Sequence, residues 1–263
     1  IMADIKAADV AKLRKMTGAG MLDCKNALKE TDGDFDQAID ILRKKGQKIA
    51  SKRAEREATE GAVIAITNEA NNKGALIVLN CETDFVAKNE DFVKFAYSIA
   101  KVALENMPAD LEALKALPIN DKNIGDEVAI QSGVIGEKIE LSFYSSLDSE
   151  YVIPYIHPGN KLATLVSLNQ EGVELQVAKD VAMQVAAINP VSVSKDDVPH
   201  DVIDKELEIG REIAIQEGKP EAIIDKIAHG KLGKFFKENT LLSQQFIKDN
   251  KISVSDYLKQ SDK

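Results

Sequence analysis

The chain has 263 residues, which at about 150 residues per domain is enough for two domains and a third small one. It carries 34 Lys and Arg against 43 Asp and Glu, a formal net charge of −9. The pI near 5.0 argues against a protein that coats nucleic acid or anionic lipid, so we expect a protein as the main partner and no direct nucleic-acid binding. No stretch approaches the ~20 apolar residues of a membrane-spanning helix, and no membrane association is expected.

The cellular compartment is indicated by the N-terminus and by the cysteines. The segment IMADIKAADV carries charges where a signal peptide has its apolar segment. The chain has two cysteines, Cys24 and Cys81, far apart in the sequence. Both features point to a reducing cytoplasm.

The first 46 residues contain three short apolar-periodic runs bounded by turn residues, a pattern typical of a compact three-helix unit. Asp34, with Gln37 three residues later, is typical of the start of the third helix, and Gly46 fits the position just after its end. We therefore predict a three-helix N-terminal domain, with a basic linker, over residues 1–55.

A charged segment, RKKGQKIASKRAEREATE at 43–60, follows these helices. It is typical of a solvated helix or a linker, and it places a domain boundary near 56–60. RNA binding is the alternative for such a basic run. The near absence of aromatic residues and the acidic balance of the chain favour the linker.

Two later regions share one order of elements. AVIAIT and GALIVLNC, separated by a polar turn, predict a β-hairpin over 62–81, and Asn89 is a suitable N-cap for a helix that ends near 105. Extended runs followed by a helical run recur over 150–189. The recurrence predicts a core of two related sheet-plus-helix subdomains, the first at 56–145 and the second at 146–195 together with 237–263.

Between the two parts of the second subdomain, residues 196–236 have the pattern of two antiparallel helices that project from the body. Gly218 is placed to end the first helix, and Pro220 suits the first turn of the second. The predicted fold class is therefore α+β.

No catalytic or metal-binding motif has convincing spacing. The sequence lacks the glycine-rich phosphate loops, HExxH, CxxC and GxSxG. A nucleophile formed by Cys81 and His157 remains an alternative, because such partners meet in space, although both cysteines fit buried apolar positions better. We expect no enzyme activity, no metal and no cofactor.

Two stretches carry more information than their periodicity. LRKMTGAGMLDCKNALKETDGDFDQAIDILRKKG at 13–46 and NCETDFVAKNEDF at 80–92 strongly resemble the bacterial elongation factor Ts family. The resemblance continues, in family order, through EGKPEAIIDKIAHGKLGKFFKE at 217–238 and QQFIKDNKISVSDYL at 244–258. It thus covers nearly the whole chain.

The resemblance implies a guanine-nucleotide exchange factor for the translational GTPase elongation factor Tu. It also implies a ubiquitin-associated-like N-terminal domain, a core of two related subdomains and a protruding coiled-coil hairpin. Such a factor performs no covalent chemistry: it binds the GDP form, releases GDP and is displaced by GTP. Family members usually continue into a final β-strand after the region that matches SVSDYLK, so we expect that a chain ending at Lys263 is truncated or has an incomplete edge.

By resemblance, Asp84 and Phe85 are the pair that enters the GTPase near its magnesium and phosphate site. An aromatic residue in a polar loop is costly to leave in water unless a partner covers it, which is compatible with this role. The alternative is that Phe85 tucks under its own loop while Asp84 supports a turn.

Four further residues match partner contacts of the family. Arg14, Met21 and Leu22 match contacts with the nucleotide-binding domain of the GTPase, and His157 matches a contact with a more distant domain. Leu22 is alternatively a core residue, and His157 is alternatively a loop residue without a special role.

The hairpin corresponds to the family's extension, through which a homodimer is possible, although its two arms can instead cover each other. Two function classes remain as alternatives. One is a ubiquitin-associated-like adaptor that does not act on nucleotide, and the other is a cysteine hydrolase.

Overall fold

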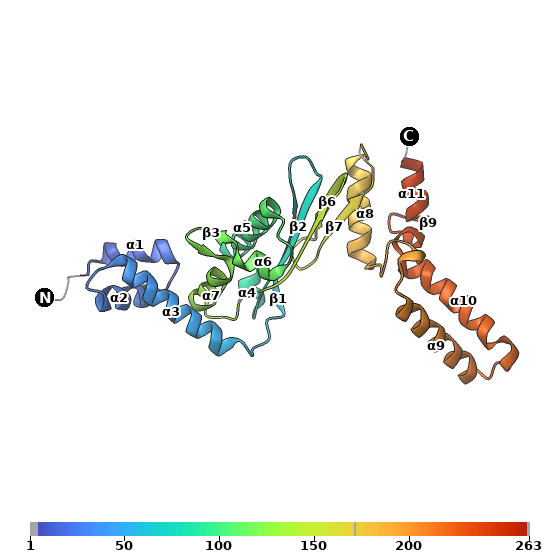
Figure 1. The fold of residues 1–263 in the computed structure, drawn as a ribbon, viewed down its shortest axis with the longest axis horizontal. Coiled ribbons are helices and arrows are strands. Elements are labelled where there is room, and N and C mark those ends of the chain that lie inside the picture. The colour runs from blue at the N-terminus through green and yellow to red at the C-terminus, as the bar shows by residue number, and fades with distance from the viewer. Residues whose placement is uncertain (1–4, 171, 262–263) are drawn as a thin grey trace. The chain divides into compact units, whose positions relative to one another are not determined.

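The computed structural model describes residues 5–170 and 172–261 (Figure 1). They form two compact units, of which the first ends at Leu165 and the second begins at Val166. Helices are combined with small antiparallel sheets, an α+β arrangement. Lys263, where a truncated end is expected, lies outside the described residues.

The first unit begins with the three expected helices, α1 (Ala7–Thr17), α2 (Met21–Glu30) and α3 (Phe35–Arg53). The Asp34 side chain accepts a hydrogen bond from the backbone N–H of Gln37 at 3.0 Å, which confirms the predicted N-cap. The helices enclose a small core of eight buried residues: Val10, Leu13, Ala19, Cys24, Ala27, Leu28, Ala38 and Leu42.

The prediction that the third helix ends before Gly46 is wrong, because α3 continues to Arg53. Gly46 lies inside α3 where this helix crosses α7 (Ile124–Ile135). A Cβ on Gly46 would lie 3.1 Å from Ile130 Cα. The glycine therefore allows close helix packing rather than a helix end, and the basic segment is largely a helix with one packed face.

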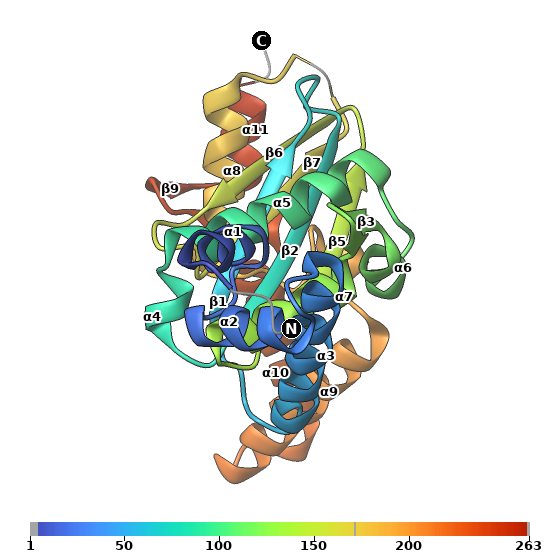
Figure 2. The same ribbon diagram turned by 90° about the vertical axis from the view of Figure 1, so that its left-hand side faces the viewer.

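A three-stranded antiparallel sheet, in the order β1-β2-β5, is the centre of the first unit. The predicted hairpin is confirmed as β1 (Glu60–Thr67) and β2 (Lys73–Cys81), and β5 (Glu140–Asp148) pairs with β2. Helix α5 (Glu90–Asn106), capped by Asn89 as predicted, packs across β1 and β2 (Figure 2). Apolar residues of the sheet and of α5 form the largest core cluster.

Several shorter elements complete the first unit. The sequence pattern predicts no individual helix or strand between residues 106 and 149, where most of these elements lie. They are α4 (Asp84–Ala87), α6 (Leu111–Ala116), β3 (Pro118–Ile119), β4 (Lys122–Asn123) and α7. The strand β6 (Tyr151–Ile156) also lies in this unit, and it is followed by β7 (Ala163–Leu168), which crosses the boundary at Leu165.

The second unit is built around α8 (Leu175–Ile188), which confirms the predicted helix. Its core cluster contains Val181, Leu241, Phe246 and Val254. The remaining elements are short 3-10 helices at Lys195–Asp197 and Leu241–Ser243, α9 (His200–Gln216), α10 (Glu221–Asn239), β8 (Gln245–Phe246), β9 (Asp249–Ser253) and α11 (Val254–Ser261). The strand-strand-helix order recurs in the two halves of the chain, and their relatedness stays a prediction.

The helices α9 and α10 pair with each other, as predicted for a helical hairpin. A Cβ on Gly210 would lie 3.0 Å from Ala228 Cα, so the backbones approach closely there. Arg211 Nε donates to Asp225 Oδ1 at 2.7 Å across the pair. The arms thus cover each other, and a homodimer through the hairpin stays a prediction.

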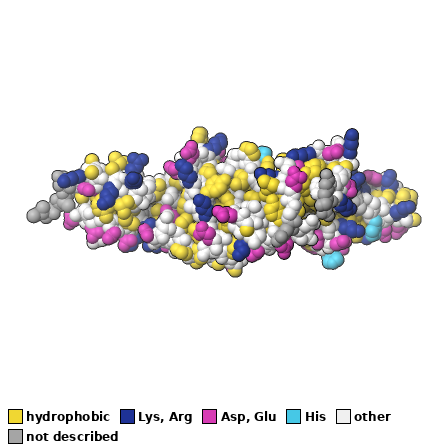
Figure 3. Space-filling model, turned by 90° about the horizontal axis from the view of Figure 1, so that it is seen from above, with side chains coloured by type: hydrophobic (Ala, Val, Ile, Leu, Met, Phe, Trp, Pro, Cys, Tyr) yellow, Lys and Arg dark blue, Asp and Glu magenta, His cyan; other side chains and the backbone are white. Residues whose placement is uncertain are grey.

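The surface carries charges of both signs. On the face drawn in Figure 3, Lys and Arg are interspersed with Asp and Glu. Among the residues that the structure describes, no helix is long and apolar enough to cross a membrane.

Candidate functional site

Phe85 is the most conspicuous apolar residue on the first unit. It lies on α4, a single helical turn that begins directly after the end of β2, and its side chain is 83% exposed. No other large hydrophobic side chain of the described residues is as exposed. The alternative that Phe85 tucks under its own loop is therefore wrong, and the ring is free to be buried by a partner, which is worth about 1.5–3 kcal/mol.

Asp84 begins α4, and its carboxylate accepts a hydrogen bond from Lys88 Nζ at 2.6 Å. This bond and the lysine's charge lower the pKa of Asp84, with a smaller contribution from the charge of Lys161. Asp84 therefore presents an ionised carboxylate beside the exposed ring of Phe85. The pair with Lys88 is solvent-exposed, so it contributes little to stability.

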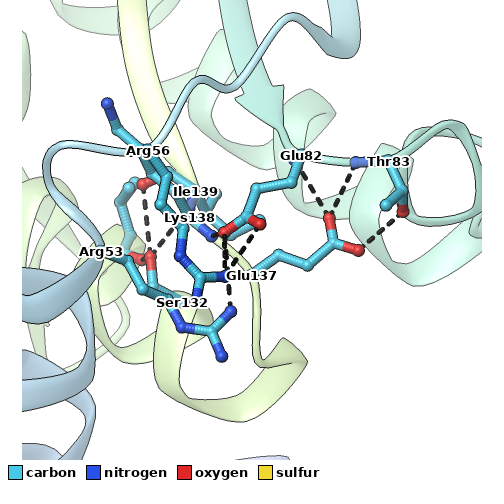
Figure 4. Close-up of polar contacts among 9 residues, drawn as sticks. Arg53, Arg56, Glu82, Thr83, Ser132, Glu137, Lys138 and Ile139 are labelled. Atoms are coloured by element: carbon cyan, nitrogen blue, oxygen red, sulfur yellow. Dashed lines mark hydrogen bonds and ion pairs between the residues drawn. The ribbon is translucent and has the colours of Figure 1, made fainter.

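Two carboxylates join the residues just before Asp84 and Phe85 to the segment that follows α7 (Figure 4). Glu137, just after the end of α7, accepts hydrogen bonds from the backbone N–H groups of Glu82 and Thr83 and from the Thr83 hydroxyl. The Glu82 carboxylate in turn accepts from the backbone N–H of Lys138. Sequence reasoning missed both carboxylates, because nothing in the local pattern shows that the end of α7 meets the end of β2.

The N-terminal helices approach the same place. Gly18, in the turn between α1 and α2, lines a groove together with Phe85 and with Val134 of α7. A Cβ on Gly18 would lie 3.5 Å from Val134 Cγ1, an ordinary packing distance. The turn that leads into Met21 and Leu22 is therefore packed against the helix that ends beside the Phe85 turn.

The predicted contact residues of this N-terminal unit are all at its surface. Met21 and Leu22, in the first turn of α2, are 52% and 69% exposed, and Arg14 is exposed on α1. The alternative that Leu22 is a core residue is wrong.

His157 lies in the turn between β6 and β7, and it is exposed. Its Nδ1 is 2.9 Å from the hydroxyl of Tyr155. The turn is anchored at β1, because Val63 N–H donates to the Asn160 carbonyl at 2.7 Å and Lys161 pairs with Glu60 at 2.7 Å.

This anchoring brings the His157 turn toward the Phe85 turn. Glu60 is opposite Cys81 in the β1-β2 register, and Cys81 ends the strand that leads into α4. The charge of Lys161 also acts on the pKa of Asp84. The structure thus places the Asp84-Phe85 turn close to elements that carry the other predicted contacts.

The geometry does not favour covalent chemistry at Cys81. Burial, with a further contribution from the charge of Glu137, raises the pKa of the Cys81 thiol to about 11, whereas a nucleophilic cysteine needs a lowered pKa. The thiol donates to the Thr83 carbonyl at 3.2 Å, and His157 contacts Tyr155. Within residues 5–170 and 172–261, no three His, Cys, Asp or Glu residues form a group that could hold a metal ion.

Comparison with known proteins places the chain in a family. The family described as elongation factor TS matches residues 82–263, from the Phe85 turn onward. The elongation factor Ts of Christiangramia forsetii is 54% identical over 263 residues, which covers 99% of this chain and 95% of that protein. The elongation factors Ts of Amoebophilus asiaticus and Chloroherpeton thalassium are 54% and 46% identical, over 97% and 100% of this chain and 92% and 93% of those proteins. The chain therefore belongs to the elongation factor Ts family.

Proposed function

We propose that this protein is a guanine-nucleotide exchange factor for elongation factor Tu that acts in translation elongation in the cytoplasm. It binds the GDP form of the GTPase, opens the magnesium and phosphate site, releases GDP and is then displaced by GTP. Membership of the elongation factor Ts family supports this function. The observation that carries the proposal is the ring of Phe85, 83% exposed beside an ionised carboxylate.

In this mechanism Asp84 and Phe85 insert into the GTPase beside its magnesium and phosphate site, and we call this pair the wedge. The ring enters an apolar site of the GTPase that is open when the nucleotide site is open, so its burial favours the open form. Because the coupling is reciprocal, preference for the open form weakens nucleotide binding by the same factor. No covalent step and no cofactor are needed.

The free energy from burial of Phe85 alone is too small to offset tight GDP binding, so more than one contact is needed. Nanomolar binding of GDP corresponds to about 12 kcal/mol, and each ~1.4 kcal/mol of coupling gives tenfold. Burial of one Phe side chain contributes ~1.5–3 kcal/mol, which is roughly one to two decades. We propose that Arg14, Met21 and Leu22, on a ubiquitin-associated-like helical unit, and His157 supply the wider interface.

Release of labelled GDP from elongation factor Tu by catalytic amounts of this protein tests the proposal. Phe85→Ala is expected to slow release by roughly one to two decades. Because the ring is exposed, its removal is expected to leave the melting temperature nearly unchanged.

Phe92→Ala is the matched control, because Phe92 is a buried phenylalanine on the neighbouring helix α5. That variant is expected to lower the melting temperature markedly. If Phe85→Ala releases GDP at the wild-type rate, or if it unfolds as Phe92→Ala does, the wedge assignment is wrong. An adaptor that does not act on nucleotide would release no GDP in either form.

A further inference from the structure

The turn that presents Phe85 is a very short helix. Helix α4 has four residues: Ala87 is buried in the main core, Val86 packs against that core, and the ring of Phe85 is exposed. A helix this short is not stable by itself, so the orientation of its first residues also depends on the residue that caps it. Thr83 is this N-cap, and its hydroxyl accepts from the backbone N–H of Val86 at 3.4 Å.

Glu137 fixes the cap. Its Oε2 accepts from the backbone N–H groups of Glu82 at 3.1 Å and Thr83 at 3.0 Å, and its Oε1 accepts from the Thr83 hydroxyl at 2.6 Å. Donating its hydrogen to Glu137 leaves the hydroxyl oxygen of Thr83 free to accept from Val86. Two of these hydrogen bonds fix the backbone and the side chain of the N-cap Thr83, and the third fixes the backbone of the preceding residue, Glu82.

The contact is reciprocal. The Glu82 carboxylate accepts from the backbone N–H of Lys138 at 2.6 Å, and it pairs with Arg53 at 3.5 Å and Arg56 at 3.1 Å (Figure 4). The hydrogen bond from Lys138 and the pair with Arg56 lower the pKa of Glu82, despite its partial burial, and keep it ionised. Each of the two segments therefore holds the backbone of the other through a charged side chain.

We propose that Glu137 is a positioning residue for exchange: it holds Thr83 so that the Asp84-Phe85 turn is presented in a fixed orientation, and Glu82 locks the same contact from the other side. This inference rests on the proposed function. A wedge gains most when its orientation is set before binding, because ordering it during binding costs free energy. Glu137 acts through Phe85 and needs no contact with the GTPase.

A double-mutant cycle between Glu137 and Phe85 tests the positioning role of Glu137. The measured quantity is the rate of release of labelled GDP, at saturating and at limiting concentrations of the exchange factor. Glu137→Ala is expected to slow release about tenfold at saturation, the size of a coupling between residues in one hydrogen-bond network. In the Phe85→Ala background the same change is expected to have no further effect. A merely structural loss would instead slow release by the same factor in both backgrounds.

Glu112→Ala is the matched control, because Glu112 is an exposed glutamate of the same unit that pairs with Lys115 on α6. It is expected to release GDP at the wild-type rate. Glu137→Asp retains the charge but shortens the side chain, so it serves where Glu137→Ala does not fold, with an expected loss of severalfold at saturation.

Two results would overturn the inference. One is a folded Glu137 variant that releases GDP at the wild-type rate, and the other is a loss that is equal with and without Phe85. The proposed function fails separately: in that case Phe85→Ala itself has the wild-type rate, or the wild-type protein releases no GDP.

Discussion

Gly46 of α3 and Gly133 of α7 face each other where the two helices cross. A Cβ on Gly133 would lie 2.4 Å from Gly46 Cα, a distance that no side chain can occupy without a shift of one backbone. The contact joins the last of the three N-terminal helices to the helix that ends beside Glu137. A single helix crossing therefore sets where the N-terminal unit lies relative to the Phe85 turn.

Gly133→Ala is expected to destabilise the protein by about 1–3 kcal/mol, because the two helices must move apart to make room for the methyl group. Urea unfolding checks the loss in the free energy of unfolding. Gly230→Ala is the control: Gly230 also lies inside a helix, α10, but a Cβ there would have no neighbour within 4 Å. That change is expected to stabilise by up to about 1 kcal/mol. Equal stability of Gly133→Ala and the wild type would show that the helices do not meet this closely.

Gly46 also shows what the sequence could not reveal about the fold. The periodicity of the three helices, the cap at Asp34 and the hairpin over 62–81 follow local rules, so the sequence predicts them. A glycine after an apolar run fits a helix end, and it equally fits a position where another backbone comes near. The close approach at Gly46 depends on α7, a helix far away in the sequence whose position local rules do not predict.

The candidate site also has one part that the sequence predicts and another that depends on tertiary contacts. Family resemblance singled out Asp84 and Phe85, but the exposure of the ring depends on how α4 packs, and the sequence allowed either outcome. Glu137 carries no motif. Its role depends on the end of α7 meeting the end of β2, which is a tertiary contact between segments far apart in the sequence.

Ionisation of Cys81 is expected to destabilise the protein at high pH. The folded protein raises the thiol pKa from about 9.0 to about 11, first through burial and then through the charge of Glu137. The folded state therefore retains a proton that the unfolded state loses. This contribution to stability is complete below about pH 9 and is lost as the pH rises toward 11.

Cys81→Ser is the comparison, because serine does not ionise in this range and still offers a hydroxyl to the Thr83 carbonyl. From pH 9 to 11, the free energy of unfolding of the wild type is expected to fall relative to that of Cys81→Ser by about 1–3 kcal/mol. Tyr257, whose pKa is raised to about 12, is present in both proteins and cancels. Parallel pH profiles of the two proteins would contradict the raised pKa of the Cys81 thiol.

GDP release by Cys81→Ser is expected to stay near the wild-type rate. Loss of GDP release in a folded Cys81→Ser variant would favour a nucleophilic cysteine.

In the second unit, Asp180 ties three segments together. Its buried carboxylate, on α8, accepts from Lys248 Nζ at 2.6 Å, between β8 and β9, and from the Tyr257 hydroxyl at 2.9 Å, on α11. Gln176 adds a third hydrogen bond from within α8. Burial alone would raise the pKa of Asp180, but the hydrogen bonds from Lys248, Tyr257 and Gln176 outweigh it and lower the pKa.

Because the folded pKa is below the unfolded value of 3.8, the contribution of Asp180 to stability is present above about pH 4 and is lost as the pH falls through the folded pKa. Asp180→Asn is expected to cost about 1–3 kcal/mol at pH 7, since the amide accepts fewer hydrogen bonds and carries no charge opposite Lys248. Below pH 4 the difference in stability from the wild type is expected to shrink.

Asp225→Asn is the control. It breaks an exposed pair with Arg211, and it is expected to leave the unfolding temperature nearly unchanged. Thermal unfolding of the wild type and the two variants from pH 3 to 7 measures these differences. If the loss of stability in Asp180→Asn stays constant down to pH 3, the ionised carboxylate is not what joins α8 to α11.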